Sequence, residues 1–315
     1  MTPPLLVHIG YHKTASSWFQ VRVFSNEACG FGAIYGRKGG HETSRIFTDR
    51  PLEFDAAAMR AHVDPYLQAI RDRGLIPVIS QERYSGHIYS GGVDSKEIAD
   101  RLYATFPDAS ILMVLREQRS MILSSYRQFV HTGGTQSLRR YLELDQLPRK
   151  QSALLDLRHL EYDRLLGYYR QLFGADRVLA LPYERMRGDP RGFVSAILEF
   201  AGSPVGEQTL DGLSFENYVN TSRGPLAGAL RRQANRLRRS EFHLDPFFAP
   251  PRGEDIAKAM ERWGERFPLP AVVEQRWQQA QRDEVARAVG DRYVDSNRRL
   301  ARMMDVDLAP LGWMV

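Results

Sequence analysis

Short apolar runs alternate with longer amphipathic segments along the first two thirds of the chain. Runs of this length, bounded by glycine or polar residues, predict buried strands, and they lie at residues 4–10, 75–80, 110–115 and 178–181. Apolar residues at helical spacing predict helices from Trp18 and at 56–73, 95–106, 118–130, 161–173 and 190–200. Strands alternating with helices indicate an α/β fold with a central parallel sheet flanked by helices.

Two segments fit this alternation less well, and a third resembles a nucleotide-binding motif only superficially. Pro77 lies inside the second predicted strand, and proline is unusual in a strand with neighbours on both sides. Residues 37–55 have no clear periodicity and are expected to form a loop. The segment Gly30-Phe-Gly32-Ala-Ile-Tyr-Gly36 lacks the spacing of a dinucleotide-binding fingerprint, because three residues separate its last two glycines.

The C-terminal third predicts helices and loops but no strand. We therefore divide the chain into an α/β core, residues 1–225, and a helical C-terminal extension, residues 226–315, packed on the core. Within the core, residues 132–160 are polar and contain Gly133-Gly134 and several arginines, so we expect an insertion over the functional site. The stretch 272–304 is a candidate dimer contact.

Composition narrows the class of protein. Of 315 residues, 43% are hydrophobic and 26% charged, which is ordinary for a globular chain. No apolar run is long enough to span a membrane, and the N-terminus lacks the basic and apolar regions of a secretory signal. The single cysteine, Cys29, excludes a disulfide framework and a cysteine-based zinc site, and it fits a cytoplasmic location.

The charge balance is mildly basic, with a net charge of +5. This excess suits a protein that handles a small polyanion. A basic run at Arg231–Arg239 has two interpretations. It is either a solvated helix face, or a surface for an acidic substrate, an anionic membrane or nucleic acid.

The strongest local signal follows the first predicted strand. The segment Gly10-Tyr-His-Lys13-Thr14-Ala15-Ser16-Ser17-Trp18 places small and hydroxyl residues at a helix start, where backbone N–H groups point at an anion. The plainer alternative is a polar turn with a serine N-cap. The segment is not a Walker A loop, because no second glycine precedes Lys13. No aspartate ends the strand at 110–115 either, which disfavours a nucleoside triphosphate with magnesium.

This segment resembles the 5′-phosphosulfate loop of the sulfotransferases that use 3′-phosphoadenosine 5′-phosphosulfate (PAPS). It departs from their pattern by having His12 in place of proline and Ala15 in place of glycine. Alanine is compatible with the loop at negative φ, whereas a positive φ there would favour glycine.

A second stretch, residues 115–126, resembles the family's 3′-phosphate element. That element is an arginine at a strand end and a serine eight residues later on the next helix, here Arg116 and Ser124. A guanidinium and a hydroxyl that converge on one phosphate are chemically reasonable. Taken alone, a strand-end arginine would more simply form a surface ion pair.

Two aromatic residues and one arginine complete the resemblance. Tyr183, in the segment 178–190, matches the tyrosine that lies by the adenine, and Trp18 matches the position of an aromatic stacked on adenine. For both, a core residue is the competing interpretation. Arg223, in Asn220-Thr-Ser-Arg-Gly224, corresponds loosely to a C-terminal segment that closes near the 3′-phosphate.

The resemblance implies a P-loop NTPase-like core and a PAPS-dependent sulfotransferase. Such an enzyme moves a sulfuryl group in line from PAPS to a hydroxyl or amine of an acceptor, here unidentified, and leaves adenosine 3′,5′-bisphosphate. Lys13 would stabilise charge on the leaving group, and the backbone N–H groups of residues 14–17 would hold the phosphosulfate. No metal is required, because the donor is already activated.

An acceptor hydroxyl also needs a general base. We expect Glu82, in Ser80-Gln-Glu82-Arg83 at a strand end, with His87 as the nearest rival. His12 lies inside the loop and is a second-tier catalytic candidate that would orient Lys13 or contact the acceptor. An ion pair with Arg83 is the alternative role for Glu82. His8 is expected to be structural.

The acceptor class stays open among small molecules, carbohydrates and lipids. One alternative function is a P-loop nucleotide kinase. The other is a non-enzymatic nucleic-acid-binding protein that uses Arg231–Arg239, although no nucleic acid partner is expected.

Overall fold

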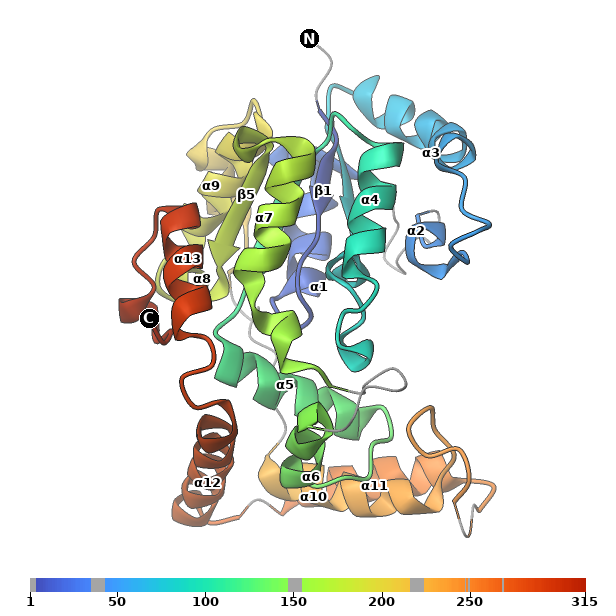
Figure 1. Cartoon of the computed structure of the whole chain (residues 1–315), viewed down its shortest axis with the longest axis vertical. Coiled ribbons are helices and arrows are strands. Elements are labelled where there is room, and N and C mark those ends of the chain that lie inside the picture. The colour runs from blue at the N-terminus through green and yellow to red at the C-terminus, as the bar shows by residue number, and fades with distance from the viewer. Residues whose placement is uncertain are drawn as a thin grey trace. The chain divides into compact units, whose positions relative to one another are not determined.

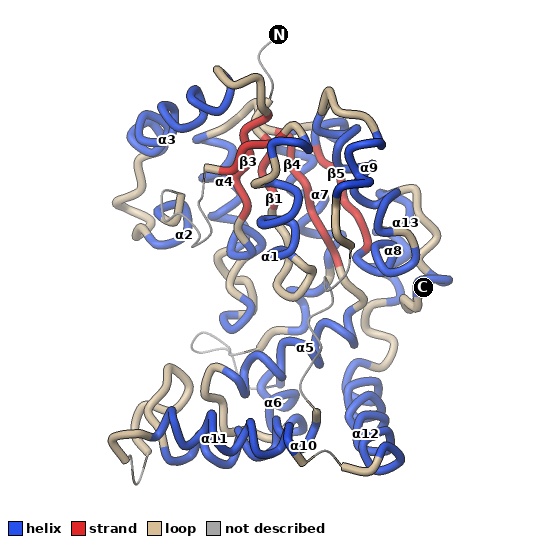
Figure 2. The backbone as a smooth tube through the Cα atoms, turned by 180° about the vertical axis from the view of Figure 1, so that it is seen from behind, coloured by secondary structure: helices blue, strands red, loops and turns tan. Residues whose placement is uncertain are grey.

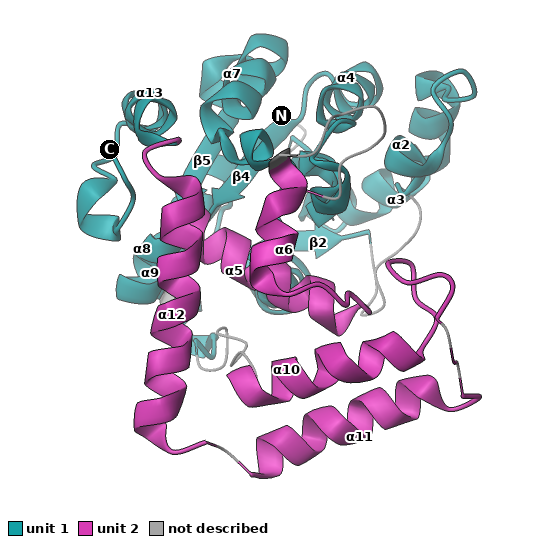
Figure 3. Cartoon of the chain, turned by 60° about the horizontal axis from the view of Figure 1, so that its bottom comes forward, with its two compact units in different colours: residues 1–117, 156–219, 293–315 teal, residues 118–155, 220–292 magenta. Residues whose placement is uncertain are grey.

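The computed structural model describes residues 4–34, 43–146, 155–215, 224–246, 248, 250–267 and 269–315. The chain forms two compact units (Figure 3). Unit 1 contains residues 1–117, 156–219 and 293–315, and unit 2 contains residues 118–155 and 220–292. The sequence does not reveal this interleaving, because it depends on contacts between distant segments.

Unit 1 is built on a five-stranded sheet whose strand pairings are all parallel, as the sequence predicts. Its strands are β1 (Leu6–His8), β2 (Phe31–Ala33), β3 (Ile76–Ser80), β4 (Ser110–Leu115) and β5 (Val178–Pro182). Their order is β2-β3-β1-β4-β5, so β1 lies between β3 and β4. The neighbours of β1 are in register at Leu6, which pairs with Val78 on one side and Ser110 on the other.

The edge strand β2 is absent from the sequence prediction. It is three residues long and has Gly32 at its centre, so it carries no β-branched run that would indicate a strand. Glycine is needed there because α3 (Ala56–Arg71) packs closely: a Cβ on Gly32 would lie 2.6 Å from Cγ2 of Ile70. Gly32 therefore weakens the strand pattern of β2 in the sequence and at the same time allows α3 to pack closely against the strand.

Pro77 is accommodated inside β3 although β3 has two neighbours. Ile76 N donates to Gly30 O (2.8 Å) on the β2 side, and alternate residues of a strand face alternate neighbours. The Pro77 nitrogen therefore faces the β1 side, one residue before the pair Leu6–Val78 with which β1 begins. The missing N–H falls just outside that ladder.

Helices cover both faces of the sheet in unit 1. On one face lie α4 (Ser95–Thr105) and α7 (Tyr162–Phe173), seen in front in Figure 1. On the other face, seen in front in Figure 2, lie α9 (Pro190–Ala201) and α1 (Ser16–Phe19), which continues into a π-helical turn at Gln20–Phe24. The predicted helices at 56–73, 95–106, 161–173 and 190–200 agree with the structure to within two residues.

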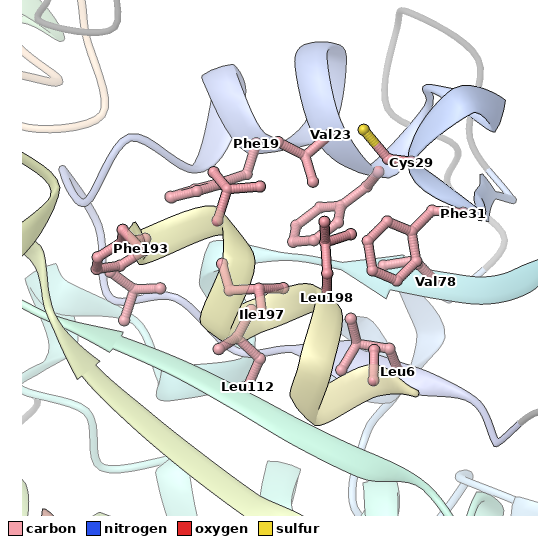
Figure 4. Close-up of a cluster of buried hydrophobic side chains, with 14 of the residues drawn as sticks. Leu6, Phe19, Val23, Cys29, Phe31, Val78, Leu112, Phe193, Ile197 and Leu198 are labelled. Atoms are coloured by element: carbon pink, nitrogen blue, oxygen red, sulfur yellow. The ribbon is translucent and has the colours of Figure 1, made fainter. Parts of the chain in front are cut away.

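Figure 4 shows the apolar cluster beneath α1 and α9. Fully or almost fully buried side chains from these helices meet those of the sheet; the cluster includes Leu6, Phe19, Val23, Val78, Leu112, Phe193, Ile197 and Leu198. Burial of this much apolar surface fixes α1 against the sheet and thereby fixes the loop that precedes it.

Three further helices belong to unit 1. The segment 37–55 is predicted as loop, but in its described part, residues 43–55, a helical turn forms at α2 (Arg45–Thr48). After β5 comes α8 (Tyr183–Gly188), and near the C-terminus α13 (Val294–Met304) packs on α7. Asp163 of α7 accepts hydrogen bonds from Ser296 and from Arg299 (2.6 Å to the latter), which ties α13 to the α/β core. The last 23 residues thus belong to the unit that holds the sheet.

Unit 2 is helical. It comprises α5 (Gln118–His131), α6 (Leu138–Glu143), α10 (Pro225–Ala234), α11 (Gly253–Arg266) and α12 (Ala271–Val289). Arg231 of α10 is 2% exposed and bonds Glu254 (3.0 Å) and Glu261 (3.4 Å) of α11. Arg238 also pairs with Glu254. Two arginines of the basic run are therefore neutralised inside unit 2, which reduces the charge the run presents.

Within the described residues, no helix combines the length and the hydropathy that crossing a bilayer requires.

Candidate functional site

The topology brings three polar segments together at one edge of the sheet. Because β1 lies between β3 and β4, the segments that follow these three strands leave the sheet side by side. Gln81 N donates to His8 O (3.1 Å), and Tyr11 N donates to Val114 O (3.3 Å). The loop 10–17, the segment with Glu82 and the strand-end Arg116 therefore meet in unit 1, as the sequence predicts.

The loop has an unusual backbone. Lys13 (φ 66°) and Ala15 (φ 62°) both adopt the left-handed conformation. The Thr14 hydroxyl donates to Tyr11 O (2.6 Å), and Phe19 N donates to Ala15 O (3.1 Å) as α1 begins. Left-handed residues in such a turn direct neighbouring N–H groups into a concavity that suits an anion. This conformation is unfavourable for alanine, so Ala15 is strained where the related loops have glycine.

Arg116 closes the loop from the side of β4. Its Nη1 donates to Lys13 O (2.9 Å), and its guanidinium carbon lies 5.4 Å from the ring centre of Tyr183. Burial lowers the pKa of Arg116, and the charges of Tyr183 and Glu184 oppose that shift. Two cationic side chains, from Lys13 and Arg116, thus belong to neighbouring strand ends joined by one hydrogen bond.

The pKa of Lys13 is lowered by the same surroundings. Burial lowers the pKa of its ammonium group, the carboxylate of Glu82 opposes this, and the charge of Arg116 adds to it. Two partly desolvated cations with lowered pKa values would gain from a bound anion, because an anion favours their charged forms.

The two aromatic residues of the resemblance are both mostly buried. Trp18 is 9% exposed and contacts Phe19 (5.3 Å between ring centres) and Phe215 (5.8 Å), as a core residue would. Tyr183 is 5% exposed, and the guanidinium groups of Arg116 and Arg187 lie over its ring. Tyr183 therefore links the core to the cationic side of the site.

Glu82 and His12 form a hydrogen-bonded pair. Nδ1 of His12 lies 3.0 Å from Oε2 of Glu82. Burial would raise the pKa of Glu82, but the hydrogen bond and charge of His12, the charge of Lys13 and the Ser16 hydroxyl bring that pKa below its ordinary value. Because an ionised carboxylate only accepts, Nδ1 carries the hydrogen. In the neutral ring Nε2 of His12 is then an acceptor, and it is buried with no partner among the described residues.

His8 lies directly beneath the loop. It is fully buried between Phe19 and Phe24, and its Nδ1 is 2.8 Å from the Ser80 hydroxyl. A Cβ on Gly10 would come within 2.8 Å of Nε2 of His8, so glycine is required where the loop crosses the imidazole. Burial lowers the pKa of His8 to about 4, against the raising effect of Glu82, and keeps the ring neutral. This agrees with the expected structural role.

The remaining candidate residues are two serines at the start of α1, one serine of α5 and Arg223. Ser16 is buried and Ser17 is exposed at the start of α1. Ser124 is half-buried on α5 and belongs to unit 2, and its role stays a prediction. Arg223 lies outside the described residues.

Glu184 is a member of the site to which the sequence alone assigns no role. Its carboxylate accepts a hydrogen bond from the N–H of Glu117 (3.0 Å), the residue after Arg116. The available signal is an acidic residue that directly follows a predicted strand and the candidate residue Tyr183. That signal has no meaning until β5 is known to lie beside β4.

Comparisons with known proteins point to one family. A family model described as the Sulfotransferase family matches residues 53–207 of the chain. That range includes Glu82, Arg116 and Tyr183 but not the loop 10–17, so the loop is independent of the match. Among curated proteins, none matches the chain by sequence.

The fold is also that of a solved sulfotransferase. A sulfotransferase from Alicyclobacillus acidocaldarius is similar over 99% of both chains at 16% identity, with a TM-score of 0.54. The sulfotransferase domain of the Synechococcus PCC 7002 olefin synthase matches 85% of this chain and 97% of its own at 15% identity, with a TM-score of 0.38. The sulfotransferase domain of the curacin biosynthetic pathway matches 92% and 98% at 13% identity, with a TM-score of 0.37.

The strain at Ala15 gives a first prediction. Ala15→Gly should raise the free energy of unfolding by about 0.5–1 kcal/mol, because glycine adopts positive φ without the Cβ clash. The matched opposite change is Gly74→Ala, at φ +74° with open space around the new Cβ, which should lower it by about 1 kcal/mol. Urea denaturation measures both, and a loss of stability in Ala15→Gly would show that the loop is not strained there.

The buried imidazole of His8 gives a second prediction. Its folded-state pKa of about 4 lies below the 6.5 of the unfolded chain, so the unfolded state binds more protons between these values. Stability should therefore fall as the pH drops from 7 to 5, by about 2 kcal/mol from this residue. His8→Gln should remove that part of the loss in urea titrations at the two pH values. An equally steep loss in His8→Gln would contradict a neutral buried imidazole.

Proposed function

We propose that this chain, whose residues 53–207 match a model of the sulfotransferase family, transfers the sulfuryl group of PAPS to a hydroxyl or amine of an acceptor. Sulfotransfer in general follows from the family. The donor, the in-line course and the residues that act are our proposal. They are supported by the loop after β1 and by the chemistry of the side chains around it.

The observation that carries the proposal is the hydrogen bond from Arg116 Nη1 to Lys13 O. It joins the anion-binding loop to a guanidinium at the next strand end. PAPS carries a phosphosulfate and a phosphate on the same ribose, so two neighbouring cationic centres suit it. A simple phosphate would need only one of them.

The residues present fit this donor. The N–H groups of the loop and the Lys13 ammonium are ligands for the phosphosulfate, and the Arg116 guanidinium is a bidentate donor for the 3′-phosphate. The nucleotide kinase alternative is not favoured, since no glycine precedes Lys13 at the Walker position and Arg116, not an aspartate, follows β4. Arg231 and Arg238, paired inside unit 2, give the nucleic-acid alternative no support.

For the base we propose His12, oriented by Glu82. The Glu82 carboxyl has a pKa below its ordinary value, so it is a weak proton acceptor. It holds the Nδ1 hydrogen of His12 and leaves Nε2 to accept, which is the arrangement of a carboxylate–histidine pair. His87, the rival base, has a pKa lowered by burial and by the charges of Arg83 and His12, with Asp94 opposing.

The proposed transfer step breaks one bond and forms another at sulfur. The bond between sulfur and the bridging phosphate oxygen breaks, and a bond between sulfur and the acceptor oxygen or nitrogen forms. His12 Nε2 takes the acceptor proton, while Lys13 neutralises the charge that develops on the bridging oxygen.

Donor binding is tested by calorimetry with adenosine 3′,5′-bisphosphate. Lys13→Ala and Arg116→Ala should each weaken binding about 10- to 100-fold, because each removes a charge-assisted contact to the ligand. The control is Arg177→Ala. It removes a half-exposed arginine just before β5, at the amino ends of the strands and therefore away from the candidate site. Equal binding by all four proteins would refute the donor site.

The base is tested with the first acceptor that supports turnover from labelled PAPS. His12→Asn should lower kcat about 10²- to 10⁴-fold and leave affinity for adenosine 3′,5′-bisphosphate unchanged. Glu82→Gln should lower kcat as well, and the double variant should be no worse than His12→Asn, because the two residues act as a unit. His62→Asn, at an exposed histidine, is the control. Near-normal kcat in His12→Asn would make Glu82 itself the base.

A further inference from the structure

One peptide group at the end of β4 is held at both of its polar atoms. The carbonyl oxygen of Arg116 accepts a hydrogen bond from the Tyr162 hydroxyl (2.8 Å). The N–H of the same peptide, that of Glu117, donates to Oε1 of Glu184 (3.0 Å). Tyr162 begins α7 and Glu184 lies in α8, so two separate elements grip the backbone that carries Arg116.

Trp313, close to the C-terminal residue Val315, contacts both of these side chains. Its indole Nε1 donates to Oε2 of Glu184 (3.0 Å). Its ring meets the Tyr162 ring at 62°, with ring centres 5.8 Å apart. Trp313 is 4% exposed, so the N–H is shielded from water and the contact is worth more than at the surface.

The segment that carries Trp313 is itself anchored to unit 1. Asn297 Nδ2 donates to Met314 O (2.7 Å), and Trp313 N donates to Leu308 O (3.3 Å). The helix before it, α13, is tied to Asp163 on α7. The indole therefore has a fixed position relative to the sheet.

The charge of Glu184 makes the indole contact important. Burial raises the pKa of this carboxyl, and the hydrogen bonds from Glu117 N and Trp313, with the charge of Arg116, oppose that rise. A partly buried carboxylate that loses one donor is poorly satisfied and binds the remaining donors in a changed geometry. The orientation of the Arg116–Glu117 peptide depends on that carboxylate.

We propose that Trp313 is a positioning residue for recognition of the donor's 3′-phosphate: it holds Glu184 and Tyr162, which orient the peptide after Arg116 and thereby aim its guanidinium. This inference rests on the proposed donor site. It assigns a role in nucleotide recognition to the extreme C-terminal segment, which lies nearly 200 residues beyond Arg116 in the sequence.

The test compares two ligands that differ only in the 3′-phosphate, adenosine 3′,5′-bisphosphate and adenosine 5′-monophosphate. The ratio of their dissociation constants, measured by calorimetry, reports recognition of that phosphate alone. A variant that merely loosens the fold shifts both constants together and leaves the ratio unchanged. Arg116→Ala should abolish the preference of the wild type for the bisphosphate.

Trp313→Phe keeps a ring against Tyr162 but removes the indole donor. It should reduce the preference for the bisphosphate about three- to tenfold while leaving affinity for the monophosphate unchanged. Tyr162→Phe removes the other hydrogen bond of the same peptide and should act in the same direction. It also keeps the test decisive if Trp313→Phe does not fold. Trp263→Phe, at a 55% exposed tryptophan of unit 2, is the matched control and should behave as wild type.

The outcomes separate the two claims. If the wild type shows no preference for the bisphosphate, or Arg116→Ala keeps it, the donor site itself is wrong. If Arg116→Ala loses the preference while the folded Trp313→Phe or Tyr162→Phe proteins keep the full wild-type ratio, the donor site stands and the positioning role of Trp313 is overturned.

Discussion

The hydrogen bond between the Arg116 guanidinium and the Lys13 carbonyl is the contact on which this site depends. It exists because β4 lies directly beside β1, so that the residues leaving these two strands meet. A parallel sheet places the carboxyl ends of all its strands on one side. The order β2-β3-β1-β4-β5 then brings the loop, Glu82 and Arg116 next to one another there. The arrangement of charge follows from the topology rather than from sequence proximity.

The site concentrates polar groups that are costly to bury. Lys13 and Arg116 both have lowered pKa values, His8 is kept neutral under the loop, and Ala15 adopts a left-handed conformation. Each of these costs free energy in the folded protein, and the apolar cluster beneath α1 and α9 offsets that cost. Strain and desolvation gathered in one loop are typical of a functional site.

The sequence is sufficient to predict most of unit 1. Four strands are predicted correctly because β1, β3, β4 and β5 are apolar runs between polar loops. The strand β2 escapes prediction because Gly32, required by the approach of Ile70, removes the pattern that marks a strand. The sequence predicts both His12 and Glu82 as site residues but does not predict their hydrogen bond. The two residues are 70 positions apart, and their contact depends on β3 lying beside β1. The division into units is beyond sequence reasoning, because it depends on contacts between segments far apart in the chain, such as residues 118–155 and 220–292 of unit 2.

The C-terminal segment illustrates the same limit. Its helical periodicity predicts packing on the core, but nothing in the sequence connects Trp313 with Glu184 or Arg116. Only the folded chain shows that a single peptide group after β4 is held by α7, by α8 and, through them, by the end of the chain. Support for Arg116, the proposed binding residue, thus comes from a distant part of the sequence.

The central claim is that the loop after β1 and Arg116 bind one adenine nucleotide together. The most direct measurement is a crystal structure of the protein with adenosine 3′,5′-bisphosphate. We expect the 5′-phosphate against the N–H groups of residues 13–17 and the 3′-phosphate against the Arg116 guanidinium. A nucleotide bound elsewhere, or bound at the loop with its 3′-phosphate turned away from Arg116, would contradict the account.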